Sequence, residues 1–451
     1  MMQLPNALKT SFALAWPISI QQVLMTVLGM VDVMMVGHLG NAAVAAVGLG
    51  NRIQFVIIVI FAGLGTALSI LVAQYWGAKN IRGIRNSVLL ASICGSALLV
   101  PVVIWLWLQA ETVVAWGSPD QQVIALGANY LRLTLVALVC SLFLIILEAA
   151  MRSVGEVKTP LAISTAAIAI NIVLNAVFIF GWGPIPAMGV AGAAIATSVA
   201  RALHVVMLLG FMLWQRHVTL PRLDNLAVIS SLSAWRRYLL LSLPMMVNFG
   251  IWSSGTFVYV MLYGRVSTEA LAIASMLTPI EGALLSLFFG MSSASAILVG
   301  QKLGARDHQQ AWTLARGFAL YNPAVAMLVG IVLALNYQYV LAPYAALGEE
   351  TLRLASQILL MMALLSWLKV TNMTLSMGIL RTGGQNKYCL LSDTFGMWCV
   401  GIPMTWLAVE MQWPFIWVYF MVYCEEIVKA ALFFRKLFSR TWMQTIAAPE
   451  H

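Results

Sequence analysis

Charge is scarce in this chain. Only 9% of its 451 residues are charged, whereas 61% are hydrophobic. A soluble domain is nearer half apolar and a quarter charged, so this composition excludes one. The apolar residues form long unbroken runs rather than short alternating segments. This pattern excludes a membrane β-barrel and indicates helices that span a lipid bilayer.

Several kinds of site are missing as well. The five cysteines all lie in apolar runs, where an odd number excludes a disulfide framework, and we expect them to be small core residues. No GxxxxGK[ST] motif is present, so no ATP site is indicated, and the five histidines show no metal-ligand spacing. We therefore expect no cofactor and no metal, and a protein that is not an enzyme.

The apolar runs predict an all-α integral membrane protein with twelve transmembrane helices. Each run approaches or exceeds the roughly 20 residues that a helix needs to cross the hydrocarbon. The expected spans are 11–37, 46–74, 86–109, 122–150, 160–182, 189–214, 236–262, 273–300, 314–338, 351–378, 389–409 and 414–436.

Basic residues indicate how these spans are oriented. Eighteen of the 25 Lys and Arg residues fall at the termini and in one set of alternate loops. They are Lys9, Lys79, Arg82, Arg85, Arg152, Lys158, Arg216, Arg222, Arg236, Arg237, Lys302, Arg306, Arg316, Arg381, Lys387, Arg435, Lys436 and Arg440. The positive-inside rule then predicts a multi-pass protein of the bacterial inner (plasma) membrane with both termini cytoplasmic. Because topology explains the net charge of +9, we expect no nucleic-acid partner.

The chain also repeats itself. At an offset of 227 residues, Pro17 matches Pro244 and Gln74 matches Gln301, and at 229 "MRSVGEVK" (151–158) matches "LRTGGQNK" (380–387). The repeat predicts two pseudo-symmetric six-helix bundles, residues 1–215 and 238–451, joined by a cytoplasmic linker at 216–237. Two such bundles suit alternating access, in which one rocks against the other around a central site.

Several motifs together resemble the bacterial type of the multidrug and toxic compound extrusion (MATE) family. They are "MVDVMMVGHLG", "AQYWGAKN" with its echo "GQKLGARD", "MRSVGEVKTP" with its echo "LRTGGQNK", "NIVLNAVFIFG" and "GVAGAAIATS". The resemblance covers essentially the whole chain. It implies a secondary antiporter that exports amphipathic organic cations in exchange for protons or sodium ions.

Asp32 is the one charged residue between positions 11 and 37. A carboxylate in lipid costs about 2.5–3.5 kcal/mol on translocon scales, which indicates a function or a place in interfacial water. Asn171 and Asn175 are four residues apart, so they share a helix face and can bind a buried acid. The resemblance implies that Asp32, Asn171 and Asn175 form a cation or proton pocket, with Thr197 joining them.

The sequence does not decide which ion is coupled to transport or how the first helix moves. Many members of the family that the chain resembles carry an aspartate where Asn175 stands, so this chain has one carboxylate where they have two. A site with one acid favours protons over sodium. Pro17 predicts a bend in the first helix. We hypothesise that protonating Asp32 breaks its contact with the Asn171 helix and changes that bend. The alternative is a static kink.

The second half carries a separate set of charges inside its spans. They are Glu281, Lys369, Asp393, Glu425, Glu426 and Lys429. They form either a second ion or substrate site or internal salt bridges that neutralise one another. Glu148 and Arg201, in the first half, are expected to be structural.

We expect a monomer whose partners are cationic drugs and membrane lipid. The alternative function is a flippase for lipid-linked oligosaccharide precursors. It is disfavoured because only Arg201 and Arg52 place basic charge near mid-membrane in the first half. A channel or a membrane-embedded enzyme fits less well, since neither a filter nor a catalytic group is apparent.

Overall fold

The structure is a computed structural model that describes residues 4–344 and 348–447. Apart from one isolated bridge between Trp182 and Ile185, the regular structure in these residues is helical. The elements are α1 (Leu4–Gly37), α2 (Asn41–Gly77), α3 (Ile81–Leu108), α4 (Ala110–Ala115), α5 (Gln121–Ser153), α6 (Lys158–Phe180), α7 (Gly189–Trp214), η1 (Leu223–Ser230), α8 (Leu232–Val266), α9 (Thr268–Gly304), α10 (His308–Leu335), α11 (Tyr337–Leu341), η2 (Ala342–Tyr344), α12 (Glu349–Met373), η3 (Thr374–Ile379), η4 (Leu380–Gly383), α13 (Asn386–Thr394), η5 (Phe395–Gly401), α14 (Ile402–Glu410) and α15 (Phe415–Phe438).

The helices cover all twelve expected spans. Within the described residues, ten helices are long and apolar enough to cross a membrane by length and composition. The eleventh span is divided among α13, the π-helix η5 and α14, so no single long helix represents it. The twelfth, α15, is long and apolar but carries three charged residues within one stretch, Glu425, Glu426 and Lys429. The integral all-α fold is thus confirmed.

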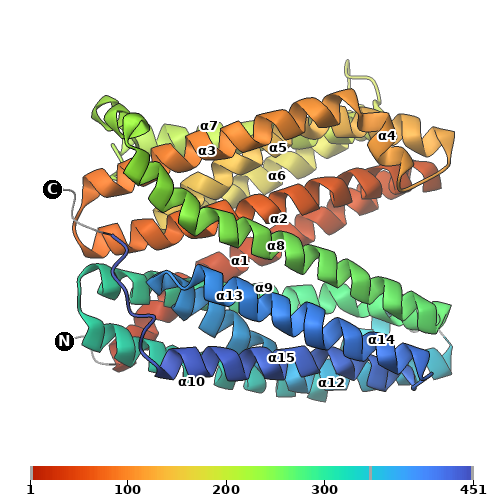
Figure 1. Cartoon of the computed structure of the whole chain (residues 1–451). Helices are drawn as coiled ribbons and strands as arrows, with labels where there is room; N and C mark the ends of the chain where they lie inside the picture. The colour runs from red at the N-terminus through yellow and green to blue at the C-terminus, as the bar shows by residue number, and fades with distance from the viewer. Residues whose placement is uncertain (1–3, 345–347, 448–451) are drawn as a thin grey trace.

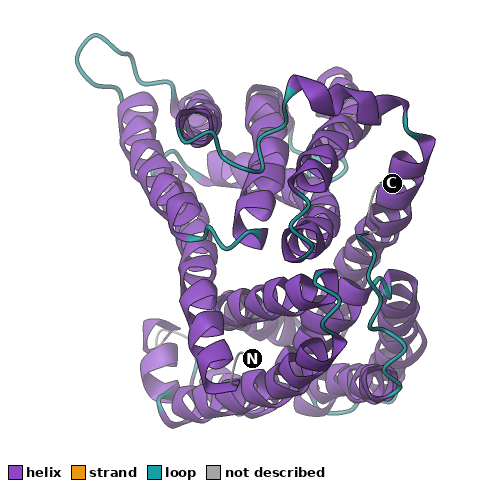
Figure 2. Ribbon diagram, turned by 90° about the vertical axis from the view of Figure 1, so that its left-hand side faces the viewer, coloured by secondary structure: helices purple, strands orange, loops and turns teal. Residues whose placement is uncertain are grey.

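The helices form two groups, α2–α7 and α9–α15, with α1 and α8 lying between them (Figure 1). Both chain termini lie at the same end of the molecule, which is called the terminal end below. At this end the ribbons of the two groups approach each other, and they diverge toward the opposite end. Figure 2 views the molecule from the terminal end and shows helices and loops without strands in the drawn residues.

The first helix of each half packs on the other half. Near the terminal end, Leu14 and Ile18 of α1 lie in a core cluster with Phe288 of α9. In the same way, Tyr238 of α8 lies in a cluster with Leu64 of α2. Toward the opposite end each helix packs on its own half: Val36 of α1 lies in a core cluster of the first half, and Tyr259 of α8 lies in one of the second half. Each helix therefore bridges the two halves along its length.

Glycines allow backbones to touch across this junction. A Cβ on Gly77 of α2 would lie 1.9 Å from the carbonyl oxygen of Gln301, and one on Gly304 of α9 would lie 1.8 Å from that of Gln74. Deeper in the membrane, a Cβ on Gly63 would meet the backbone of Met246 at 2.6 Å. Its repeat equivalent Gly290 faces the backbone of α1 in the same way. Glycines that correspond in the sequence repeat therefore make equivalent contacts in the structure.

The expected linker, residues 216–237, is partly helical. It contains η1, and α8 begins within it at Leu232 because the Ser231 side chain accepts a hydrogen bond from the Ala234 N–H and caps that helix. Asn225 of η1 donates to Asn86 of α3 over 2.7 Å, which holds the linker on the first half. The exact domain boundaries remain a prediction.

We expect Gly77→Ala and Gly304→Ala to force α2 and α9 apart at the terminal end. A methyl group placed within 2 Å of a carbonyl oxygen must displace the backbone, at an expected cost of about 1–3 kcal/mol in the free energy of unfolding. Thermal unfolding in detergent measures this loss. Gly48→Ala is the matched control, because nothing lies within 4 Å of its Cβ position. Equal stability of Gly77→Ala and Gly48→Ala would contradict the assignment.

Candidate functional site

Asp32 lies on α1 and is held by α6. The Nδ2 atom of Asn175 donates to Oδ1 of Asp32 over 2.6 Å and to Oδ1 of Asn171 over 3.0 Å. Both asparagines are buried, whereas Asp32 is half-buried. Asn171 and Asn175 are about one helical turn apart, so their amide groups lie on the same face of α6, as the sequence predicts. A single carboxylate therefore links α1 to α6.

One atom of this site is left without a partner. Among the described residues, no group donates a hydrogen bond to the buried Oδ1 atom of Asn175. A buried acceptor without a donor costs free energy, and such atoms call for an explanation. Asp32 as an anion has no proton to give, so this acceptor is open to a protonated Asp32, a water molecule or a cation.

Thr197 and Arg201, both on α7, relate to this site differently from the two asparagines. The Thr197 hydroxyl donates to the carbonyl oxygen of Ala193 on its own helix over 2.9 Å, and no hydrogen bond joins it to Asp32 in the described residues. Arg201 extends toward α1, where its Nη2 atom lies 3.8 Å from the sulfur of Met25. Arg201 thus places a positive charge beside the helix that carries Asp32.

A second polar attachment of α1 lies nearer the terminal end. Glu148 of α5 accepts a hydrogen bond from Gln21 of α1 over 2.9 Å and pairs with Arg152 at 3.1 Å. His204 of α7 lies 3.4 Å from the same carboxylate. The sequence analysis did not identify this cluster as a unit. The spacing of four residues between Glu148 and Arg152 was the one local signal for it.

Pro17 lies inside α1, which is one continuous helix from Leu4 to Gly37. It lies within the stretch from Leu14 to Ile18, which packs on the second half, and it precedes Gln21 and Asp32, which bind the first half. A proline at such a position weakens the helix where its two ends belong to different bodies. The bend itself remains a prediction.

The intramembrane charges of the second half separate into three groups. Lys429 contacts two carboxylates, those of Glu425 at 3.1 Å and Glu426 at 2.8 Å, and the hydroxyl of Tyr259 donates to Glu425. Lys369 pairs with Glu281, and its ammonium lies 5.2 Å from the ring centre of Tyr423. Asp393 belongs to neither of these groups.

Asp393 instead pairs with Arg381. The two side chains lie 3.1 Å apart, and Asn248 bonds to both of them. Arg381 lies in the η4 turn between two spans, as the sequence predicts, but this turn is inside the protein, since the residue is only 3% exposed. The reason is local: the chain after α12 continues as a π-helix and a 3-10 turn, which carries Arg381 into the protein interior.

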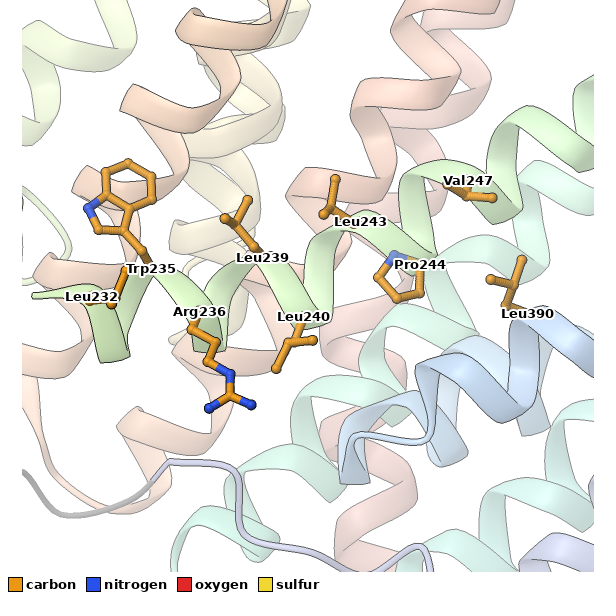
Figure 3. Close-up of a pocket in the computed structure, with 9 residues that line it drawn as sticks. All are labelled: Leu232, Trp235, Arg236, Leu239, Leu240, Leu243, Pro244, Val247 and Leu390. Atoms are coloured by element: carbon orange, nitrogen blue, oxygen red, sulfur yellow. The ribbon is translucent and has the colours of Figure 1, made fainter.

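A groove of about 580 Å³ lies elsewhere, along the terminal-end part of α8. Figure 3 shows the lining residues along α8, with Leu390 on α13, and Arg236 and Leu240 extending to the same side of the helix. The lining is apolar and includes Leu240 and Leu243, both about half exposed. It contains none of the intramembrane charged groups described above.

No metal site accompanies these charges. Among residues 4–344 and 348–447, no group of three or more His, Cys, Asp and Glu side chains is placed to hold a metal ion. The Asp32 site offers one carboxylate oxygen and the amide oxygens of Asn171 and Asn175. These ligands suit a proton or a hard monovalent cation, and they do not suit a transition metal.

Comparison with known proteins identifies the family. A family model described as MatE matches residues 17–177 and 244–407, and these two segments begin 227 residues apart, at Pro17 and Pro244. A "probable multidrug resistance protein NorM" of Bradyrhizobium diazoefficiens is 26% identical over 87% of this chain and 85% of its own length. An "uncharacterized transporter YisQ" of Bacillus subtilis is 20% identical over 96% of this chain and 94% of its own length.

Solved structures share the fold. A MATE protein in complex with MaL6 has a TM-score of 0.87 at 19% identity, over 96% of both chains. An outward-facing conformation of a multidrug resistance MATE family transporter of the MOP superfamily also scores 0.87 at 19% identity, over 96% of this chain and 95% of the other. Since the family model covers more than half of the sequence, the chain belongs to the MatE family and is a multi-pass membrane transporter, not an enzyme.

Proposed function

We propose that this protein is an antiporter that exports amphipathic organic cations in exchange for protons, with Asp32 as the coupling carboxylate. The observation that carries the proposal is the bond between Asp32 and Asn175, together with the unpartnered Oδ1 atom of Asn175. Multidrug resistance in the names of several relatives supports drug cations as the substrate class.

Protonation of Asp32 would reverse the direction of its hydrogen bond with Asn175. The Asp32 anion accepts from Asn175, whereas a protonated Asp32 has a hydroxyl to donate. The unpartnered Oδ1 atom of Asn175 is the acceptor that this hydroxyl could use after the amide rotates. Such a rotation would also disturb the bond from Asn175 to Asn171. A proton would thus change how α1 is attached to α6.

The packing of α1 carries that change to the junction between the halves. Its terminal-end part packs on α9, while Asp32 and Gln21 attach it to α6 and α5. In alternating access the two halves move against each other. Altering the attachment of α1 at Asp32 would therefore change the relative stability of the conformations between which the halves move. Pro17 lies in the part of α1 that packs on α9, ahead of both polar attachments, and it stays the expected place of the bend.

We further propose that both termini are cytoplasmic, that the protein acts as a monomer in the bacterial inner membrane, and that sodium is not the coupling ion. Sodium would need several oxygen ligands at once, and Asp32 is the one carboxylate among the three side chains of this site. A single carboxylate supplies one negative charge, which one proton neutralises. No cofactor is required for this mechanism.

The second half offers its own candidate for ion binding. The Lys369–Glu281 and Arg381–Asp393 pairs are balanced in charge, and we assign them a structural role. Lys429 contacts two carboxylates, so this buried cluster has two acidic groups and one ammonium to balance them. We propose that Glu425, held by Tyr259, takes up a proton or cation there.

Dye efflux from everted vesicles tests the coupling. A proton gradient should drive efflux in the wild type, whereas a sodium gradient alone should not. Asp32→Asn keeps the shape but cannot become an anion, so we expect proton-driven efflux to be lost. Asp224→Asn, which removes an exposed carboxylate of η1, should leave efflux unchanged. Normal pumping by Asp32→Asn, or efflux driven by sodium alone, would refute the proposal.

Stability measurements test the charge assignment at Lys429. Lys429→Met leaves two buried carboxylates without their cation, and we expect unfolding free energy to fall by about 3–5 kcal/mol. Adding Glu425→Gln and Glu426→Gln to that variant should restore most of the loss, because no charge then stays uncompensated. Lys387→Met, at an exposed lysine, is the control. A triple variant as unstable as Lys429→Met would show that packing, not charge, holds the cluster.

A further inference from the structure

The C-terminal segment, residues 441–447, crosses from the second half to the first. In Figures 1 and 2 it runs from the end of α15 toward the end of α2. It has no helix of its own, yet Trp442 and Ala447 are buried. Here this segment is called the C-terminal strap. Buried irregular chain at the surface of a bundle must satisfy its backbone polar groups, so its partners indicate what it does.

The strap is anchored in the second half by Trp442. The indole is fully buried and donates to the carbonyl oxygen of Leu437 over 3.1 Å. A Cβ on Gly383 would lie 1.7 Å from the Trp442 carbonyl oxygen, so the strap touches the turn that follows α12 and η3. Thr445 adds a bond to the carbonyl oxygen of Leu303 at the end of α9, over 2.9 Å.

The other end of the strap is bound by the first half through Gln74 of α2. The Oε1 atom of this fully buried glutamine accepts from the backbone N–H groups of Ile446 at 2.6 Å and Ala447 at 3.0 Å. Its Nε2 atom donates to the carbonyl oxygens of Gln444 at 3.2 Å and Thr382 at 2.6 Å. Ile446 and Ala447 also pack in the core cluster of the first half. One side chain thus joins α2, the strap and the η4 turn.

The internal repeat shows that the strap is an addition to a symmetric junction. Gln301 is the repeat equivalent of Gln74, and its Nε2 atom donates to the carbonyl oxygen of Ser153 over 3.1 Å. Ser153 and Thr382 correspond at the offset of 229, so each glutamine binds the matching turn of the opposite half. Among the described residues, only Gln74 also receives backbone N–H groups from a chain end.

We propose that the C-terminal strap holds the terminal end closed, and that its release from Gln74 is a required step when this side opens. The strap is fixed to the second half by Trp442 and Thr445 and to the first half by Gln74, so the two halves cannot separate there while both attachments hold. That this end faces the cytoplasm rests on the proposed function. The strap would therefore bias the transporter against the inward-open state.

The test compares the two equivalent glutamines in the full-length chain. Spin labels on Arg82→Cys of α3 and Gln309→Cys of α10, both exposed, report the separation of the halves at this end, with the native cysteines changed to serine. Gln74→Ala and Gln301→Ala each remove one junction bond, but only Gln74→Ala releases the strap. Losing a hydrogen bond of ordinary strength should raise the open fraction about fivefold more in Gln74→Ala than in Gln301→Ala.

A backbone variant isolates the strap itself. Ile446→Pro removes one N–H donor while both glutamines stay in place, so it should also raise the open fraction, and Ala447→Pro should do the same if Ile446→Pro folds poorly. Combining Ile446→Pro with Gln74→Ala should add less than the sum of the two, because both act on one contact. Unchanged distances in both proline variants, or equal effects of the two glutamine variants, would overturn the proposal. Since these distances need neither drug nor ion gradient, they stand apart from any failure of the efflux test.

Discussion

The backbone contact between α2 and α9 is the constraint on which the arrangement of the two halves depends. Gly77 and Gly304 bring each helix against a glutamine carbonyl of the other, which no larger residue would permit. Because the contact lies at the terminal end, the halves approach there and diverge toward the opposite end (Figure 1). Halves that touch at one end and diverge at the other show one of the two arrangements that alternating access exchanges.

Given that contact, α1 and α8 become the connecting elements. Each packs on the foreign half near the terminal end and on its own half toward the other end. A change in how such a helix is attached is felt by both halves. The polar groups on these helices, Asp32 on α1 and Tyr259 on α8, each bind a neighbouring helix of their own half. The buried polar attachments and the contacts between the halves thus lie on the same two helices.

The interpretation of individual residues from the sequence was uneven, for physical reasons. The register of Asn171 and Asn175 follows from helical spacing, and the structure places them beside Asp32. Arg381 lies in a turn between two spans as expected, but its burial was not predicted because a π-helix followed by a 3-10 turn leaves no periodic signal. Glu148 contacts Gln21 across 127 positions, and no local pattern predicts a contact at such a separation.

The sequence by itself determined the membrane class, the twelve spans and the internal repeat. These properties follow from composition, run length and matching positions, and each is a sum over local residues that needs no knowledge of neighbours in space. Only the tertiary structure decided the pairing of Lys369 with Glu281, the exchange of α1 and α8 between halves, and the binding of the C-terminal strap to Gln74. Those outcomes depend on residues far apart in the sequence meeting in a protein interior, where an unpaired charge or amide must find whichever partner the packing brings within reach.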